Sequence, residues 1–266
     1  MPMAAPRRVL LSSAALFGRP LAQTMSLAAD AGYGGIEVMV TRDPGSQDPR
    51  RIRQLASAYG LEVGALHAPC LLLTRRVWGT DPVGKIHRAM EVAEAAGAPL
   101  VVMHPPYRWQ RAYRSWLEER LAGLEQRTGV LVAFENMFPV HVGRRPVAFH
   151  TNQDLDDLDR FDDLTLDTSH AAVAGHDLLE VRRRFGPRLR HVHLSDNAGK
   201  GWDSHLPPGE GVLELDDLLN DLTSAGYEGA VTLEVDLRRH AGDAGRLREV
   251  MVAMRERTES LLAPRG

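Results

Sequence analysis

The sequence predicts a single (β/α)8 TIM barrel, an α/β fold, and three observations support that prediction. The chain has 266 residues, close to the roughly 250 residues of one such barrel. Short apolar runs alternate with amphipathic stretches along the chain, which is the pattern of parallel strands joined by crossover helices. A content of 44% hydrophobic and 25% charged residues is ordinary for a globular protein with one large core.

Eight strands are predicted because eight short runs are rich in leucine and β-branched residues and have apolar interiors, as expected for strands that are buried on both faces. We expect them at residues 9–13, 35–40, 61–67, 100–104, 131–135, 164–167, 191–195 and 231–235.

Eight helices are predicted between and after these strands, where apolar residues recur at spacings of three and four. We expect them at residues 21–31, 48–59, 82–97, 111–128, 153–160, 176–185, 215–225 and 243–261. Glycines that stand just before a strand are expected to end helices in the left-handed conformation, namely Gly32, Gly60, Gly97, Gly129 and Gly226. No linker rich in Pro, Gly or Ser divides the chain, so residues 1–266 are expected to form one domain.

Charge and cysteine content exclude several classes of protein. A formal net charge of −3 argues against a dedicated polycation that coats nucleic acid. The one cysteine, Cys70, cannot form an intrachain disulfide, and we expect an inert buried thiol there and a cytoplasmic location. No apolar run approaches the ~18 residues of a membrane span, so no membrane partner is expected.

Polar residues occur at or near the carboxyl ends of six predicted strands. These residues are His67, His104, Glu135, Asp167, His193 and Glu234. An isolated carboxylate buried among apolar strand residues costs several kcal/mol unless it is paired or bound to a cation. Because the carboxyl ends of barrel strands converge on one mouth, we expect a shared metal or catalytic site there. For His67 and His104 alone, a simple hydrogen bond to a neighbour inside the barrel is an equally good interpretation.

Two local patterns sharpen this prediction. Asp167 and His170 lie three residues apart just past a strand, and the stretch after His193 brings Asp203 and His205 into one loop. The predicted mouth loops also carry cations and aromatic residues, Trp109 and Trp202 among them, which suit a sugar phosphate or a nucleic-acid strand.

The motifs that carry a family resemblance span nearly the whole chain. They are Gly35-Ile36-Glu37, Leu66-His67-Ala68-Pro69, Val102-Met103-His104-Pro105, Phe134-Glu135-Asn136, Leu166-Asp167-Thr168-Ser169-His170, His193-Leu194-Ser195-Asp196, His205-Leu206-Pro207-Pro208-Gly209-Glu210-Gly211 and Leu233-Glu234. Together they resemble the xylose isomerase-like TIM-barrel superfamily, in particular its sugar phosphate isomerase/epimerase branch, which is also related to endonuclease IV.

The resemblance to the isomerases and epimerases implies one divalent metal held by Glu135, Asp167, His193 and Glu234. Such an oxygen-rich set suits Mn2+, Mg2+ or Co2+, with Zn2+ as an alternative. It further implies that Glu135 and Glu234 act as the catalytic residues, moving a carbon-bound proton of a sugar or sugar phosphate through a metal-stabilised enediolate. Substrate contacts are expected from His67, His104, His170, Asp203, His205 and Lys200.

The endonuclease IV branch is the alternative, because the sequence supplies every ligand of its three zinc ions. By resemblance, His67, His104 and Glu135 would hold one zinc; Glu135, Asp167, His193 and Glu234 a second; and His170, Asp203 and His205 a third. The protein would then be a phosphodiesterase that acts on abasic DNA.

Departures from the endonuclease IV pattern favour the isomerase or epimerase. Cys70 stands where that family has a tyrosine after the strand-three histidine, and Met137-Phe138-Pro139 replaces its turn rich in Thr, Ala and Gly. A binding protein, lyase or dehydratase on the same barrel is a third possibility. Leu261 and Leu262 suggest an exposed apolar helix face and hence a homo-oligomer.

Overall fold

The computed structural model describes residues 9–69, 76–142, 145–150 and 155–263, and within them eight parallel strands close into one barrel. Each strand pairs with the barrel strand before and after it in the chain, and β1 pairs with β10 to close the ring. This confirms the predicted (β/α)8 barrel. The barrel strands are β1 (Val9–Ser12), β2 (Gly35–Met39), β3 (Glu62–His67), β4 (Leu100–Met103), β5 (Leu131–Glu135), β8 (Leu164–Asp167), β9 (Leu189–Leu194) and β10 (Ala230–Leu233).

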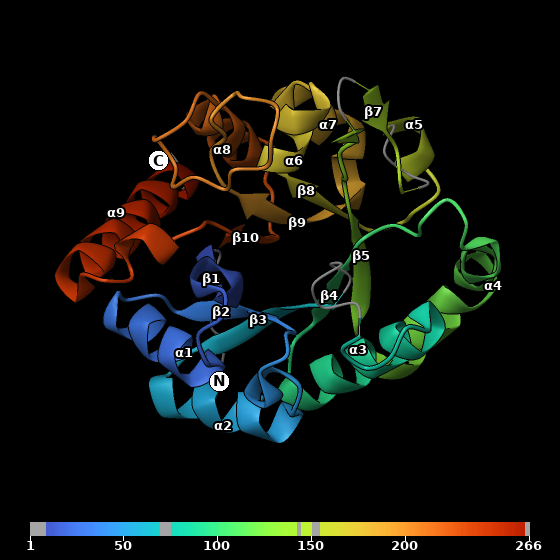
Figure 1. The fold of residues 1–266 in the computed structure, drawn as a ribbon, viewed down its shortest axis with the longest axis horizontal. Coiled ribbons are helices and arrows are strands. Elements are labelled where there is room, and N and C mark those ends of the chain that lie inside the picture. The colour runs from blue at the N-terminus through green and yellow to red at the C-terminus, as the bar shows by residue number, and fades with distance from the viewer. Residues whose placement is uncertain (1–8, 70–75, 143–144, 151–154, 264–266) are drawn as a thin grey trace.

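Helices form a ring around the strands (Figure 1). They are α1 (Leu21–Asp30), α2 (Pro49–Tyr59), α3 (Pro82–Ala96), α4 (Arg111–Thr128), α5 (Leu155–Leu158), α6 (Thr168–Ala174), α7 (Leu178–Phe185), α8 (Leu215–Ser224) and α9 (Ala244–Leu262). Helix α3 shows how the sequence sets their ends, since Asp81 accepts hydrogen bonds at the N-terminus, Pro82 occupies the first turn and Gly97 ends the helix in the left-handed conformation. The other predicted helix-ending glycines, Gly32, Gly60, Gly129 and Gly226, also have positive φ.

The segment between β5 and β9 differs most from the prediction. A short antiparallel hairpin of β6 (Val140–Val142) and β7 (Arg145–Val147) follows β5. The sequence did not predict it, because three-residue strands are too short to show a periodic pattern. The helix predicted at 153–160 is reduced to the single turn of α5, and its first residues lie outside the described part of the chain. The helix predicted at 176–185 begins two residues later, at Leu178, and an additional helix, α6, starts directly at the end of β8.

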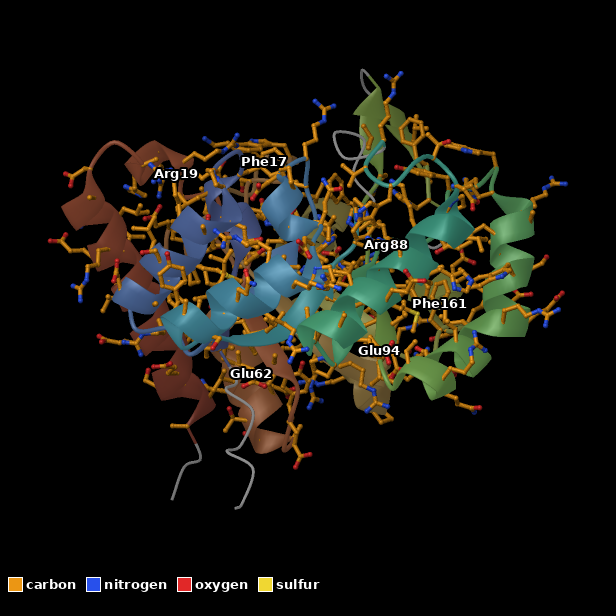
Figure 2. All side chains as sticks on the ribbon, turned by 90° about the horizontal axis from the view of Figure 1, so that it is seen from below. Phe17, Arg19, Glu62, Arg88, Glu94 and Phe161 are labelled. Carbon is orange, nitrogen blue, oxygen red and sulfur yellow. The ribbon has the colours of Figure 1, made fainter. Side chains whose placement is uncertain are left out.

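The two ends of the barrel are distinct. Phe17 and Arg19, which follow β1, lie at one end in Figure 2, whereas Glu62 at the start of β3 lies toward the other. Most buried apolar residues lie in one large cluster, whereas Ala65, Leu100, Val102 and Ala133 form a separate small one. His67, Glu135 and Asp167 are the last residues of β3, β5 and β8, so they lie at the carboxyl end of the barrel.

Two smaller expectations concern the surface. Leu262 is buried and Leu261 packs against the core, so these leucines do not form the exposed apolar face that was expected for an oligomer. Cys70 lies outside the described residues. Among the described helices, none combines the length and apolar character needed to cross a bilayer.

Candidate metal centre and active site

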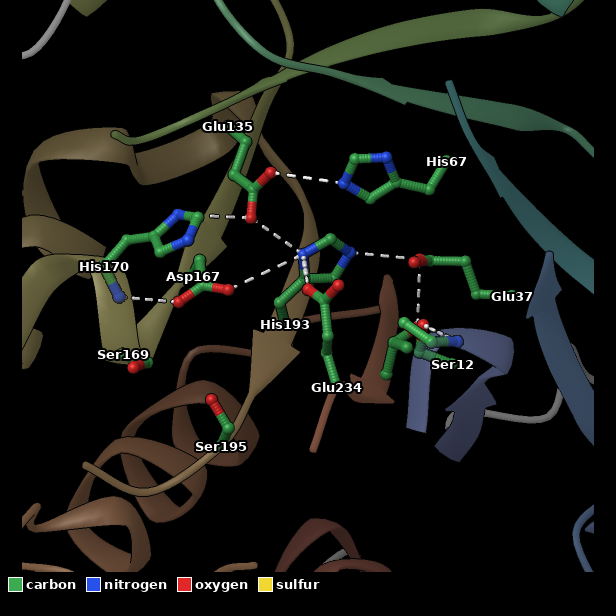
Figure 3. A network of polar contacts seen from close by, with 12 residues as sticks. Ser12, Glu37, His67, Glu135, Asp167, Ser169, His170, His193, Ser195 and Glu234 are labelled. Atoms are coloured by element: carbon green, nitrogen blue, oxygen red, sulfur yellow. Dashed lines mark hydrogen bonds and ion pairs between the residues drawn. The ribbon is translucent and has the colours of Figure 1, made fainter. Parts of the chain in front are cut away.

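Glu135, Asp167, His193 and Glu234 meet at the carboxyl end of the barrel (Figure 3). They come from the ends of β5 and β8, from within β9 and from the residue after β10, and all four are buried. Each offers one ligand atom, and these atoms all lie within 4.8 Å of one another. The structure thus brings together the four residues that the sequence predicts as metal ligands.

The Nδ1 atom of His193 lies at the centre of this group. It is 2.7 Å from Glu234 Oε2, 2.9 Å from Glu135 Oε1 and 3.8 Å from Asp167 Oδ2. Three carboxylates therefore face a single imidazole nitrogen. This arrangement leaves a surplus of negative charge inside the barrel, which a bound cation would neutralise.

The orientation of Asp167 follows from helix α6. Its Oδ1 atom accepts a hydrogen bond of 2.7 Å from the backbone N–H of His170, so Asp167 caps the helix. The side-chain amide of Asn136 holds the Asp167 backbone on both sides, accepting from its N–H at 2.7 Å and donating to its carbonyl at 3.0 Å. The position of Oδ1 is thereby fixed, and the other oxygen, Oδ2, faces His193.

Among the four residues of this centre, two buried carboxylate oxygens lack hydrogen bonds within the described structure, Asp167 Oδ2 and Glu135 Oε2. The Nε2 atoms of His104 and His67 lie 3.2 and 3.5 Å from Glu135 Oε2, close enough for electrostatic attraction. Leaving such an atom unsatisfied costs about 1–3 kcal/mol or more when the group is charged. The donor set of three carboxylates and one imidazole fits a divalent cation of the Mn2+ or Mg2+ kind, and also Zn2+.

Burial and charge together shift the pKa values of these groups. Burial raises the pKa of Asp167 to about 7, and the positive charges of His170 and His205 oppose this only in part. For Glu135, burial acts in the same direction, but the charges of His193 and His170 outweigh it and hold the pKa well below its usual range. For His193, burial disfavours the charged form, yet the surrounding carboxylates raise the pKa well above its usual range. The centre without a cation is thus held together by a protonated imidazole.

Glu37 holds the other side of His193 and is a site residue that the sequence prediction missed. Its Oε2 accepts from Nε2 of His193 at 3.1 Å and from Nε2 of His191 at 2.7 Å, and the Thr232 hydroxyl lies 3.4 Å away. A carboxylate on one imidazole nitrogen fixes the tautomer and presents the other nitrogen to a metal. Two signals could have revealed it: Glu37 is the one charged residue of an apolar strand, and His191 lies two residues before His193, on the same face of β9.

A second cluster lies beside the centre and nearer to solvent. Asp203 Oδ2 accepts from Nε2 of His205 at 2.8 Å and lies 3.4 Å from Nε2 of His170, while the Ser169 hydroxyl donates to Oδ1. His205 also donates from Nδ1 to the backbone carbonyl of Glu234 at 2.9 Å. Burial opposes the charged form of His205, but Asp203 outweighs it and raises the pKa to about 10. His205 adopts a positive φ of 41°, a strained conformation typical of functional sites.

A cavity of about 470 Å3 opens over both clusters. Most of the residues predicted to contact substrate line it, namely His67, His104, His170, Asp203 and His205. Lys200 does not line this cavity and is exposed in the loop after β9, so its role remains a prediction. Arg238 and Arg239 line the cavity without having been predicted, and each is already paired with a carboxylate, Asp236 and Glu210 respectively.

Comparisons with known proteins agree with this architecture. The family model described as xylose isomerase-like TIM barrel matches residues 25–257. An uncharacterized protein of Mycobacterium tuberculosis is 38% identical over 247 residues, covering 86% of this chain and 88% of that protein.

Two solved structures share the fold at low identity. The IolI protein with a bound zinc atom superposes with a TM-score of 0.72 at 17% identity, covering 96% of this chain and 99% of that one. The D-allulose 3-epimerase of a Methylomonas species, in complex with D-allulose, superposes with a TM-score of 0.65 at 21% identity, covering 96% of this chain and 99% of that one. From the match over most of its length, together with the closed barrel and its strand-end motifs, the chain belongs to the xylose isomerase-like TIM barrel family.

Proposed function

We propose that the protein is a divalent-metal-dependent isomerase or epimerase that acts on a small sugar or sugar phosphate. The observation that carries this proposal is the convergence of four buried ligand atoms within 4.8 Å, with Asp167 Oδ2 unsatisfied among them. A divalent metal bound there would polarise a substrate carbonyl and so acidify the neighbouring C–H bond. The sugar complex of the D-allulose 3-epimerase and the zinc of the IolI protein support a sugar substrate and a metal in this fold.

Glu135 and Glu234 are assigned the proton transfer. They extend from β5 and from the end of β10, and both line the cavity above His193. In the protein without a cation, the charge of His193 lowers the pKa of both carboxyls against the opposing effect of burial. A bound divalent cation, held by a neutral His193, would keep both carboxyls ionised in its place. One carboxylate would take the proton from the carbon next to the carbonyl and the other would deliver a proton to the product, a role typically worth about 10^2 to 10^4 in rate.

The cluster around Asp203 is assigned to substrate orientation. His170 and His205 line the cavity beside Asp203. Asp167 and Asp203 raise the pKa of His170, and Asp203 raises that of His205, so both imidazoles carry a proton on each nitrogen. A sugar hydroxyl that donates to Asp203, or a sugar oxygen that shares one of these N–H groups with it, would be oriented by this cluster. A reducing, cytoplasmic setting is part of the same proposal, since the chain has one cysteine.

Solvent isotope exchange tests the proposal most directly. The metal-loaded protein is incubated in D2O with a panel of ketoses, aldoses and their phosphates, and NMR follows deuterium entering carbon next to the carbonyl. We expect exchange on at least one sugar, lost in Glu135→Gln and Glu234→Gln and retained in Glu94→Gln, an exposed glutamate far from the mouth. Absence of exchange on every sugar would overturn the proposal.

Metal analysis separates this function from the phosphodiesterase alternative. About one Mn2+, Mg2+ or Co2+ per chain, in protein purified without chelator, is the expected result. Close to three Zn2+ per chain, with cleavage of abasic DNA, would replace the proposed function by the endonuclease IV type of reaction.

A further inference from the structure

A second cavity opens directly beside the site cavity. It holds about 330 Å3, and His104 lines both cavities, so the two are neighbours through that side chain. Its walls come from the loop before α3, from the loop between β4 and α4, and from His150 beyond the β6–β7 hairpin. Apart from His104, its residues have no part in the metal centre or in the proposed proton transfer.

One wall of this cavity is a row of stacked rings that leads away from His104. The rings of His104 and His150 meet edge to face at 6.0 Å, His150 stacks on Tyr107 at 4.4 Å, and Tyr107 stacks on Trp109 at 4.8 Å with the planes 2° apart. Trp109 ends the row and is 65% exposed. Because much of the indole surface is exposed and it lies beside a cavity, a flat, weakly polar ring of a ligand could stack on it.

Backbone contacts hold this wall in place. The Tyr107 N–H donates to Gln110 Oε1 at 2.8 Å, and the Arg108 N–H donates to the Phe149 carbonyl at 2.9 Å. The His150 ring donates from Nδ1 to the Pro105 carbonyl at 2.7 Å. Burial, reinforced by the charge of His104, lowers the pKa of His150 to about 4, so the ring is neutral near pH 7. The wall is therefore fixed and His150 adds no charge to it.

The lining of the cavity also includes polar side chains. Lys85 is buried there, with its Nζ donating to the Pro69 carbonyl at 2.7 Å, and Thr80 and Gln110 line the cavity as well. The Nε2 group of Gln110 makes no hydrogen bond within the described residues, so it can donate to a ligand hydroxyl. Ligand sites typically combine an apolar or aromatic wall with a few such polar groups.

We propose that this second cavity is a subsite for a ring-bearing substituent of the substrate. The substrate would then be a conjugated sugar, with its reacting sugar in the cavity above His193 and an attached aryl or second sugar ring against Trp109. The inference rests on the proposed function for the identity of the reacting part. Binding energy gained at such a remote ring can be used to position the reacting carbon.

Binding of glycosides tests the subsite without requiring turnover. The glycosidic bond at the anomeric carbon keeps the sugar ring closed, so these ligands bind without reacting. Calorimetric titration of the Mn2+-loaded protein compares the methyl and phenyl glycosides of glucose, galactose and mannose. We expect the phenyl glycoside of at least one sugar to bind about 10-fold more tightly than its methyl counterpart, a typical size for ring stacking. In Trp109→Ala the two should bind within about twofold of each other.

Trp202→Ala is the matched control, because Trp202 is 54% exposed and lines only the first of the two cavities. That variant should weaken both glycosides together and keep the ratio of their dissociation constants. The subsite would be overturned if the methyl and phenyl glycosides had nearly equal dissociation constants in the wild type, or if the preference for the phenyl glycoside persisted in Trp109→Ala. This holds whatever the isotope exchange shows. If Trp109→Ala abolishes the preference for the phenyl glycoside but no sugar exchanges deuterium in the wild type, the subsite is supported and the proposed function is overturned. Failure of every glycoside to bind would overturn the subsite.

Discussion

The two polar clusters at the barrel mouth have opposite balances of charge. Around His193, the carboxylates of Glu135, Asp167 and Glu234 face one imidazole nitrogen, and two of their oxygens remain without hydrogen bonds in the described structure. Around Asp203, one carboxylate is shared by two imidazoles and a hydroxyl. The first cluster therefore has more carboxylates than imidazoles, whereas the second has more imidazoles than carboxylates. This difference supports the proposal that residues which look alike in the sequence divide into metal ligands and groups that orient substrate.

The largest expected effect comes from removing one charge of the inner cluster. Asp167→Asn keeps an oxygen that can cap α6 but loses the negative charge, so we expect metal affinity to fall by more than about 100-fold. Asp177→Asn is the matched control, because Asp177 caps the next helix, α7, in the same way and is exposed. Competition titration with a metal-binding dye measures both variants, and equal affinity in the two would contradict the assignment.

Glu37→Gln should have the next largest effect, because it acts on the metal only through His193. The neutral amide no longer holds the Nε2–H of that imidazole with a charged acceptor, and we expect a 10- to 100-fold loss of metal affinity. The control is Glu62→Gln, an exposed glutamate at the start of β3. The rise in melting temperature on adding metal serves as a second readout, and an unchanged rise would argue that Glu37 has a purely structural role.

Neutralising the outer cluster should affect stability more than metal binding. For Asp203→Asn we expect a loss of about 1–2 kcal/mol at pH 7 and less than a threefold change in metal affinity. The pKa of His205 is raised to about 10, so its stabilising pair with Asp203 is fully present below pH ~6.5 and is lost as the pH rises through about 10. Thermal melts of the wild type and variant should therefore differ most near pH 6 and converge above pH 10. A difference that stays constant with pH would point to lost packing instead of a lost ion pair.

The smallest effect is expected at Lys200, which is exposed and outside the cavity lining. An exposed ion pair contributes at most about 1 kcal/mol, so Lys200→Ala should raise KM for a phosphorylated sugar by about threefold. The same substitution should not alter KM for the unphosphorylated sugar. Steady-state kinetics on the two forms decides this, and equal changes would argue that Lys200 does not contact the phosphate.

Much of this site could be predicted from the sequence, because barrel closure converts strand-end positions into neighbours. The convergence of Glu135, Asp167, His193 and Glu234 follows from the strand assignment and the rule that carboxyl ends meet, and the family resemblance singled these four out of six strand-end residues. Glu37 was harder to predict, since its partners lie 154 and 156 residues away and its charge in an apolar strand does not say which residues it contacts. The aromatic row through Trp109 depends on the β6–β7 hairpin, whose three-residue strands carry no periodic signal.

The contact between Glu37 and His191 also bears on how the protein assembles. It joins residues 154 positions apart in the chain, and β2 and β9 are separated in the barrel by β1 and β10. This contact therefore forms only once residues from the first and third quarters of the polypeptide have met, and such distant pairings carry a large entropic cost of loop closure. Under the proposed function, metal uptake would depend on the assembled barrel, because the four proposed ligands come from strands spread from β5 to the residue after β10.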